Sequence, residues 1–429
     1  MFSRRITPIG GKKKMNRRLE YESETGFKSV PFGEREDFYN RNRVIHETLQ
    51  LRKPSLKDLN AAQYLSSVES YISEELISSQ NYTEIKKLAS YFNRGITSFF
   101  GFESRLSSLD ARADYLFAVS SQKGEREALA SLFTSKTLPE SFLNQKEWQN
   151  VGKFAIKWAD SQSVLYNNVL GLWLEFDTAA SSSETPVPSI FIQVPPLRID
   201  SPEDIQKCHW LTHTALPLLS GQPLTEKMQK NLLNALQQMP KTASVTLLGS
   251  MLSRKVSGIR LVIYKISPKQ IIPYITSLGW IDENNGLTQL MEELEDIASR
   301  IVLHISITEN GIDQKIGLEC AHYPDQYALE TNWQKFFDYL IQKNACLPEK
   351  KAVILDFLGA EQDDSTQMFN TTSYQVAARI HGNDFSAALV RYISHIKICY
   401  TPSHPIEAKA YPGIRLFGQS KTNTRASYQ

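Results

Sequence analysis

One pattern constrains this chain more than any other: an amphipathic helical stretch followed by two strand-like runs, and it recurs five times. Short turns separate several of the runs, as at Glu309-Asn310-Gly311. Helical stretches lie between the pairs, at 125–133, 225–239, 287–298 and 333–343. The paired runs span 99–106 with 112–119, 170–177 with 189–194, 244–252 with 259–266, 301–307 with 315–321, and 393–400 with 406–416.

These pairs predict an α/β protein in which five repeated helix-plus-hairpin units form ten antiparallel strands. A sheet of that size curls or closes unless its edges are covered. We therefore expect one barrel domain over residues 56–418, with the helices outside. A ten-stranded barrel is wider than the eight-stranded kind that side chains fill, so its lumen is expected to hold a ligand.

Alternation along the strands indicates which side chains face that lumen. In 259–266, Leu261 and Ile263 face one side, whereas Arg260 and Tyr264 face the other. Two further strands split in the same way, separating Ile316, Leu318 and Cys320 from Lys315, Gly317 and Glu319, and Ala408 and Ala410 from Lys409 and Tyr411. The polar second faces favour a polar lumen; the alternative is an open sheet with one solvated face.

Both ends of the chain, 1–55 and 419–429, are polar, and we expect them to be tails outside the domain. The first tail is basic at Arg4, Arg5, Lys12, Lys13, Lys14, Arg17 and Arg18. It is either a solvated terminus or a docking arm for an acidic partner. Over the whole chain, Lys+Arg 48 against Asp+Glu 46 leaves a charge of +2, which argues against a general nucleic-acid binder.

The four cysteines have no Cys-x-x-Cys spacing, which fits a reduced, cytoplasmic compartment. No apolar run approaches the roughly 20 residues that span a bilayer, so no membrane insertion is expected.

His209 and His213 have a spacing that metal sites use, but no third ligand lies near in sequence. Neither a phosphate-binding P-loop nor a Gly-x-Ser-x-Gly motif occurs, which disfavours an NTPase and a serine hydrolase.

Short motifs add to the architecture. Glu103-Ser104 lies on the first predicted strand, Arg112 begins the second, and 260–264 reads Arg-Leu-Val-Ile-Tyr. In this order, the motifs and the repeated units resemble the ABBA aromatic prenyltransferases, particularly the dimethylallyltryptophan-synthase-like branch, over roughly 61–418. In that comparison Glu103 looks like the acid/base glutamate, Arg112 like the first diphosphate-binding arginine, and 260–264 like the Arg-x-Lys-x-Tyr strand.

The sequence also departs from that pattern. Val262 stands where the family's strand has lysine, and 189–193 lacks the basic residue expected in the second unit. In the fourth unit, Lys315 and Glu319 replace a polar and aromatic pair. Two interpretations remain open: a diverged enzyme whose cations moved to Lys397 and Lys409, or a barrel that has lost the chemistry.

The resemblance implies a reaction with three requirements. Cations stabilise the leaving diphosphate, aromatic faces stabilise the allyl cation, and a carboxylate accepts the ring proton. For the proton we expect Glu103; the alternative is that Glu103 forms a salt bridge with Arg105 or Arg112, and that Glu319 or Glu407 pairs with Lys409. The predicted substrate-binding residues are Arg105, Arg112, Trp173, Arg260, Tyr264, His304, Lys315, Lys397, Lys409 and Tyr411.

The predicted function is prenyl transfer from an allylic diphosphate to an electron-rich aromatic acceptor, either a small molecule or a peptide. No cofactor is expected to be required: no Asp-Asp-x-x-Asp motif is present, which disfavours obligatory metal binding through such a motif, and Mg²⁺ is left as possible. The alternative is a non-catalytic barrel that binds a small hydrophobic molecule, a peptide or a protein partner.

Overall fold

The computed structural model describes residues 61–92, 99–122, 124–178, 185–253, 258–322, 330–363 and 385–420. The predicted basic tail at 1–55 lies outside these ranges, so its role stays a prediction. Residues 419 and 420, which we expected in the second tail, belong to the last strand instead. Among the described residues, no helix is both long and apolar enough to cross a bilayer.

Ten strands form a closed antiparallel barrel, which confirms the predicted fold. Strand β9 closes the ring because it pairs with β7 on one side and β11 on the other, while β12 pairs with β1. The barrel strands are β1 (Phe99–Arg105), β2 (Ala113–Ser120), β3 (Gly171–Phe176), β4 (Pro188–Leu197), β5 (Ser244–Ser250), β6 (Ile259–Tyr264), β7 (Arg300–Thr308), β9 (Ile316–Ala321), β11 (Phe385–Tyr400) and β12 (Glu407–Ser420). Two short strands that we did not predict, β8 (Gly311–Ile312) and β10 (Gly359–Asp363), pair with β7 and β11.

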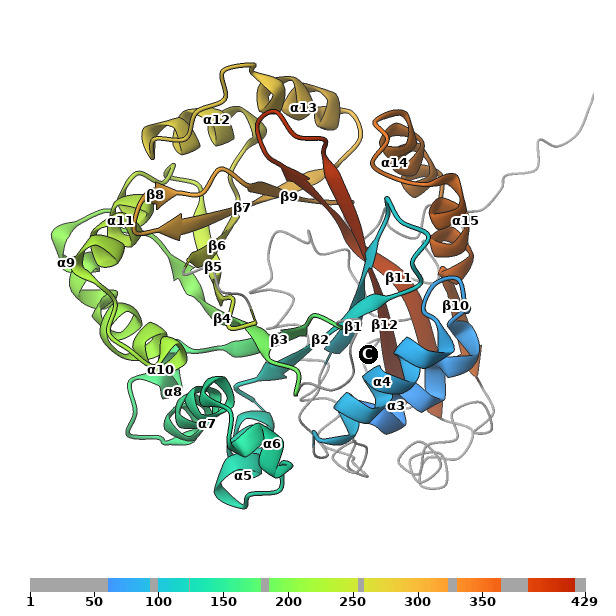
Figure 1. The fold of residues 1–429 in the computed structure, drawn as a ribbon, viewed down its shortest axis with the longest axis horizontal. Coiled ribbons are helices and arrows are strands. Elements are labelled where there is room, and N and C mark those ends of the chain that lie inside the picture. Colours follow the sequence, from blue (N-terminus) through green and yellow to red (C-terminus); the bar gives the residue numbers. More distant parts are fainter. Residues whose placement is uncertain are drawn as a thin grey trace, which may run out of the picture.

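Helices surround the barrel, as Figure 1 shows in a view along its axis. Local capping explains where several of them begin: the Thr225 hydroxyl accepts from Met228 N at the start of α11, and Ser267 forms a capping box with Gln270 at α12. The helices are α3 (Ala61–Val68), α4 (Ser79–Ser90), α5 (Glu125–Thr134), α6 (Glu140–Leu143), α7 (Lys146–Ala159), α8 (Leu165–Asn168), α9 (Pro202–Lys207), α10 (Leu216–Ser220), α11 (Glu226–Gln237), α12 (Pro268–Ser277), α13 (Gly286–Glu295), α14 (Glu330–Gln342) and α15 (Pro348–Phe357), with a 3₁₀ turn η2 (Glu69–Tyr71) and a π-helix η3 (Leu211–Ala215).

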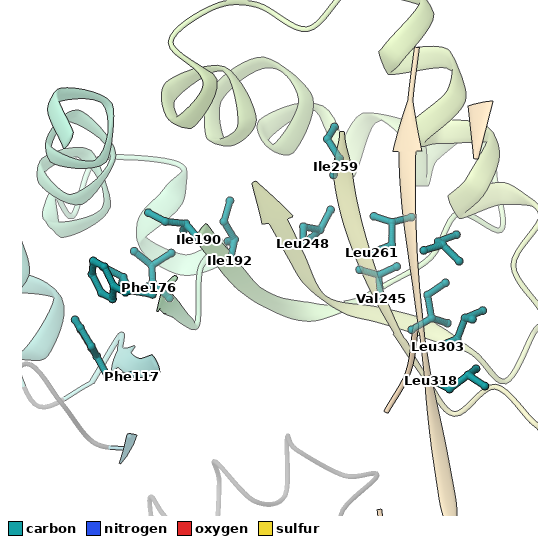
Figure 2. Close-up of a cluster of buried hydrophobic side chains, with 14 of the residues drawn as sticks. Phe117, Phe176, Ile190, Ile192, Val245, Leu248, Ile259, Leu261, Leu303 and Leu318 are labelled. Atoms are coloured by element: carbon teal, nitrogen blue, oxygen red, sulfur yellow. The ribbon is translucent and has the colours of Figure 1, made fainter. Parts of the chain in front are cut away.

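The main hydrophobic core lies between the barrel and the helices. Alternate residues of each strand point outward into it, among them Leu261, Leu303 and Leu318, which Figure 2 shows along consecutive strands. Aromatic contacts continue the core outward: Trp148 of α7 stacks on Phe176 of β3 with ring centroids 6.1 Å apart. The predicted alternation is therefore confirmed, and the second faces of the strands point into the lumen.

A smaller apolar cluster occupies part of the lumen itself. It consists of Phe191, Leu247, Val262, Tyr264 and Val302. Phe191 fits because Gly249 lies opposite on β5, where a Cβ would approach the Phe191 ring to 2.6 Å. The lumen is therefore partly packed and partly polar, whereas we expected a polar lumen.

Irregular register at one strand brings extra polar groups inward. The pairing of β11 with β12 shifts between Ile393 and Ile396, as in a β-bulge. Bulges re-aim side chains, and both Ser394 and His395 in this segment line the lumenal cavity.

Candidate active site in the barrel lumen

The lumen contains a cavity of about 60 Å³. A volume of that size holds roughly four to six waters and lies well below the roughly 300–1,000 Å³ of ordinary small-molecule pockets. Side chains of the lumenal apolar cluster explain the difference from the roomy lumen that strand number predicts. The cavity is lined by Gly101, Phe102, Leu116, Trp173, Glu175, Phe191, Leu247, Val262, His304, Glu319, Ser394, His395, Lys397, Tyr411 and Pro412.

Glu103 lies in the lumen and is held by two groups of β12. The ammonium of Lys409 and the hydroxyl of Tyr411 both donate to its carboxylate. Burial alone would raise the pKa of Glu103, but the charge and hydrogen bond of Lys409 outweigh it and hold this pKa well below its usual range. Glu103 is therefore a firmly ionised carboxylate, paired with Lys409 rather than with Arg105 or Arg112.

The two predicted arginines of the first hairpin pair locally. Arg105 Nη2 lies 2.9 Å from Asp114 Oδ2, and Arg112 Nε donates to Asp110 Oδ2 at 2.6 Å. Both guanidinium side chains keep about two fifths of their surface exposed, at 42% and 41%. Neither is among the residues that line the cavity.

Lys315 is likewise not brought to the cavity. Its ammonium lies 2.7 Å from Glu407 Oε2, in an exposed ion pair. Glu407 therefore pairs with Lys315, and not with Lys409 as in the alternative that the sequence left open.

Lys397 has a different environment, although it lies directly opposite Lys409 on the adjacent strand. It is buried and lines the cavity, and none of the described carboxylates is within ion-pair distance of its ammonium. Burial and the charge of Arg260 both lower the pKa of Lys397, while the charges of Glu175 and Glu103 oppose them. Its amine is thus a lumenal cation without an ion-pair partner in the described part of the chain.

Arg260 is anchored by Ser306, because its Nε donates to Ser306 Oγ at 3.1 Å. The two residues face each other across β6 and β7. Arg260 contributes positive charge that acts on both Lys397 and Glu175. Arg260 and Lys397, both predicted to face the lumen, therefore bring two positive charges into the barrel interior.

Glu175 is the lumenal group that the sequence analysis missed. It lies on β3 between Trp173, which also lines the cavity, and Asp177. Burial, opposed by the charge of Lys397 and assisted by Glu103, raises the pKa of Glu175 to about 7. The signal was present: in 170–177, Leu172, Leu174 and Phe176 alternate with Trp173 and Glu175, so the same period-two argument would have found it.

Two histidines and a carboxylate form a second polar group in the cavity wall. His304 Nε2 lies 3.1 Å from Glu319 Oε2, and His395 Nδ1 lies 3.6 Å from Glu319 Oε1. Burial and the charge of Lys397 lower the pKa of His304 to about 3, so the ring is neutral at ordinary pH. A neutral His304 donates from Nε2 to Glu319, which leaves its buried Nδ1 with a lone pair and no hydrogen-bond partner among the described groups.

The predicted aromatic residues lie in the lumen but in different places. Trp173 and Tyr411 line the cavity, and the Tyr411 ring stacks on His395 with centroids 4.1 Å apart. Tyr264 instead belongs to the packed apolar cluster. Of the predicted aromatic residues, Trp173 and Tyr411 are therefore the two that border the cavity.

The candidate metal residues do not gain a third ligand. His209 and His213 are exposed on and beside the π-helix η3, where their rings stack 3.7 Å apart and nearly parallel at 6°. Two parallel imidazoles cannot both direct a ring nitrogen at one ion without turning. Within the ranges described above, no group of three His, Cys, Asp or Glu residues could hold a metal.

Comparison with known proteins gives structural likeness only. No family model and no curated protein matches the chain. Among solved structures, the apo form of the prenyltransferase PriB is 11% identical, with 83% of this chain and 95% of that chain covered and a TM-score of 0.45. AnaPT from Neosartorya fischeri is 14% identical, with 86% and 96% covered and a TM-score of 0.45. A ternary complex of PriB with L-tryptophan and dimethylallyl thiolodiphosphate is 11% identical, with 82% and 95% covered and a TM-score of 0.44. Because these scores are low, the function of this chain is argued from its own residues.

Proposed function

We propose that this barrel transfers a prenyl group from an allylic diphosphate to an electron-rich aromatic acceptor in its lumen. The observation that carries the proposal is the cavity itself. It brings together the ammonium of Lys397, a carboxylate at Glu175 whose pKa is near 7, and apolar and aromatic walls.

The cations serve the leaving group. Lys397 and Arg260 repel each other in a partly dry interior, and a diphosphate would compensate both. Binding such a polyanion would also restore the charge that burial disfavours on Lys397. The C–O bond of the allylic diphosphate would then break with its negative charge stabilised.

The walls serve the allyl cation. Its charge is attracted to the faces of Trp173 and Tyr411, and Phe191 and Leu247 exclude water that would otherwise capture it. A carbon of the acceptor ring attacks the cation and forms the new C–C bond. That ring carbon still carries its hydrogen, which must leave as a proton to restore aromaticity.

Glu175 is the better acceptor for that proton. A carboxylate with a pKa near 7 is ionised in part at neutral pH and holds the proton once it is transferred. Glu103 remains a candidate for this role, but Lys409 and Tyr411 stabilise its ionised form so strongly that it is a weak base. In this proposal Glu103 fixes Lys409 and Tyr411 in place.

Cavity size sets a condition on the proposal. A prenyl diphosphate and an aromatic ring do not fit in about 60 Å³, so substrate binding must displace side chains of the apolar cluster. The small cavity and the complete pairing of Glu103 favour the second candidate function, a non-catalytic barrel that binds a smaller or partly inserted ligand.

Calorimetry distinguishes the prenyltransferase from the non-catalytic barrel. The ligand is dimethylallyl thiolodiphosphate, an analogue whose bond to the allyl group resists ionisation. The proposal predicts binding that Lys397→Met weakens by about 1.5–3 kcal/mol, the contribution of a hydrogen bond to a charged group. Lys315→Met is the matched control, because Lys315 is exposed and pairs with Glu407 away from the cavity. If the wild-type protein binds none of the analogue at millimolar concentration, the transferase proposal is wrong, and the interpretation as a non-catalytic binding barrel replaces it.

A further inference from the structure

The side chain of Lys397 lies in a position that suits covalent chemistry as well as anion binding. It is buried at 8% exposure and borders a cavity that other molecules of a few atoms could enter. A Cβ placed on Gly317 would lie 3.2 Å from Lys397 Cε and 3.0 Å from His304 Cβ. The glycine therefore lets the lysine stem and the imidazole approach each other over the strand.

Ionisable groups surround this amine from six strands. They are Glu103, Glu175, Arg260, His304, Glu319 and Lys409. Cations already lie beside two of these carboxylates: Lys409 pairs with Glu103, and Arg300 Nη2 lies 3.9 Å from Glu319 Oε1. Lys397 thus combines burial, a neighbouring cation and no paired carboxylate within the described segments, and this setting shifts a lysine side chain toward its free amine.

We propose that Lys397 forms an imine with a small carbonyl compound that enters the lumenal cavity. The inference goes beyond prenyl transfer and uses the amine of Lys397 as a nucleophile. Cavity size limits the partner to a carbonyl compound of a few heavy atoms, such as a short aldehyde or a 2-oxo acid. The positive charge of Arg260 favours one that carries a carboxylate.

The chemistry balances with groups already in the cavity. The lone pair of Lys397 Nζ attacks the carbonyl carbon, one proton of the resulting ammonium passes to the former carbonyl oxygen, and a neutral carbinolamine forms. Glu175 can donate a proton to the departing hydroxyl because its pKa lies near 7, so water leaves and the C=N bond forms. No oxidant or reductant is needed, and hydrolysis reverses the step.

Reductive methylation of the full-length protein with formaldehyde and cyanoborohydride tests this. The reagent is small enough for the cavity, and peptide mass spectrometry reports the rate at each lysine. At neutral pH we expect Lys397 to be modified faster than Lys409, because burial and Arg260 lower the pKa of Lys397 and so raise its free-amine fraction. Lys409 is the matched internal control because its cross-strand position is equivalent and Glu103 raises the pKa of its ammonium against the effect of burial.

Two further arms sharpen the result. Glyoxylate, an anionic aldehyde, should label Lys397 and lose most of that labelling in Arg260→Met, whereas formaldehyde should still label it. Dimethylallyl thiolodiphosphate should slow the labelling of Lys397 if it binds. If it does not bind, the labelling of Lys397 should be unchanged, and the transferase proposal alone would be wrong. If Lys397 stays unmodified after the exposed Lys315 has reacted, or reacts no faster than Lys409, the imine proposal is wrong.

Discussion

The pair of Glu103 and Lys409 joins β1 to β12, and its removal gives a sharp prediction. Lys409→Met leaves a carboxylate in the lumen with Tyr411 as its one remaining donor among the described residues. Breaking a fully buried pair costs about 3–5 kcal/mol. Because 22% of the Lys409 side chain and 11% of the Glu103 side chain remain exposed, we expect a loss of about 2–3 kcal/mol in the free energy of unfolding.

Urea denaturation at neutral pH, followed by fluorescence and far-ultraviolet circular dichroism, provides the measurement. The double variant Glu103→Gln/Lys409→Met removes both charges and should recover at least half of the loss; with the single variant Glu103→Gln completing the cycle, the coupling energy should be at least about 1 kcal/mol. Lys315→Met again serves as control and should cost less than about 1 kcal/mol, because that pair is exposed. A loss below about 0.5 kcal/mol in Lys409→Met would refute the pairing as a source of stability.

The same pair makes a prediction about pH. The folded-state pKa of Glu103 lies below its unfolded value, so its stabilising contribution is present above that unfolded value. It is lost as the pH falls through the depressed folded pKa. Wild-type protein should therefore lose more stability than Glu103→Gln during acid titration, as urea midpoints at several pH values would reveal.

Three further predictions concern the cavity. Glu175→Gln should gain stability relative to wild type as the pH rises from 4.5 to about 7, because burial disfavours the ionised form of Glu175 and raises its pKa. Equal urea midpoints of the two proteins across that range would contradict this prediction. Gly317→Ala should lower the free energy of unfolding by about 1–3 kcal/mol, because the new methyl group meets His304 and Lys397. An unchanged free energy of unfolding would show that both side chains move aside without cost. Phe191→Ala should enlarge the cavity and tighten analogue binding despite a loss of stability; calorimetry showing weaker binding would contradict a steric block.

The barrel followed from sequence because its outer face is regular. In β6, Leu261 and Ile263 pack outward while Arg260 and Tyr264 point inward, as alternation requires. Each hairpin is local in sequence, so strand pairing within a unit could be predicted. Closure followed from strand number and helix placement.

The interior was harder to predict because it depends on contacts between distant strands. Phe191 lies in an apolar run, where hydrophobicity does not show which side faces the lumen. Val262 shares the inward face of Arg260 and Tyr264, but alternation within one strand does not show that it packs against Phe191 and Leu247, so the packed cluster was missed. The partner of Glu103 lies 306 residues away and is set by the register of the closing strands. The bulge before Ile396, which turns His395 into the cavity, has no sequence signal of its own.

Turnover tests the central claim most directly. Purified full-length protein is incubated with dimethylallyl diphosphate and an aromatic acceptor such as tryptophan or a tryptophan- or tyrosine-containing peptide, and diphosphate release and prenylated product are quantified together. The account predicts acceptor-dependent release matched by product, which Glu175→Gln reduces on the order of 10²-fold and Lys315→Met leaves unchanged. Absence of product with every indole, phenol and peptide acceptor, or equal product from Glu175→Gln, would contradict it.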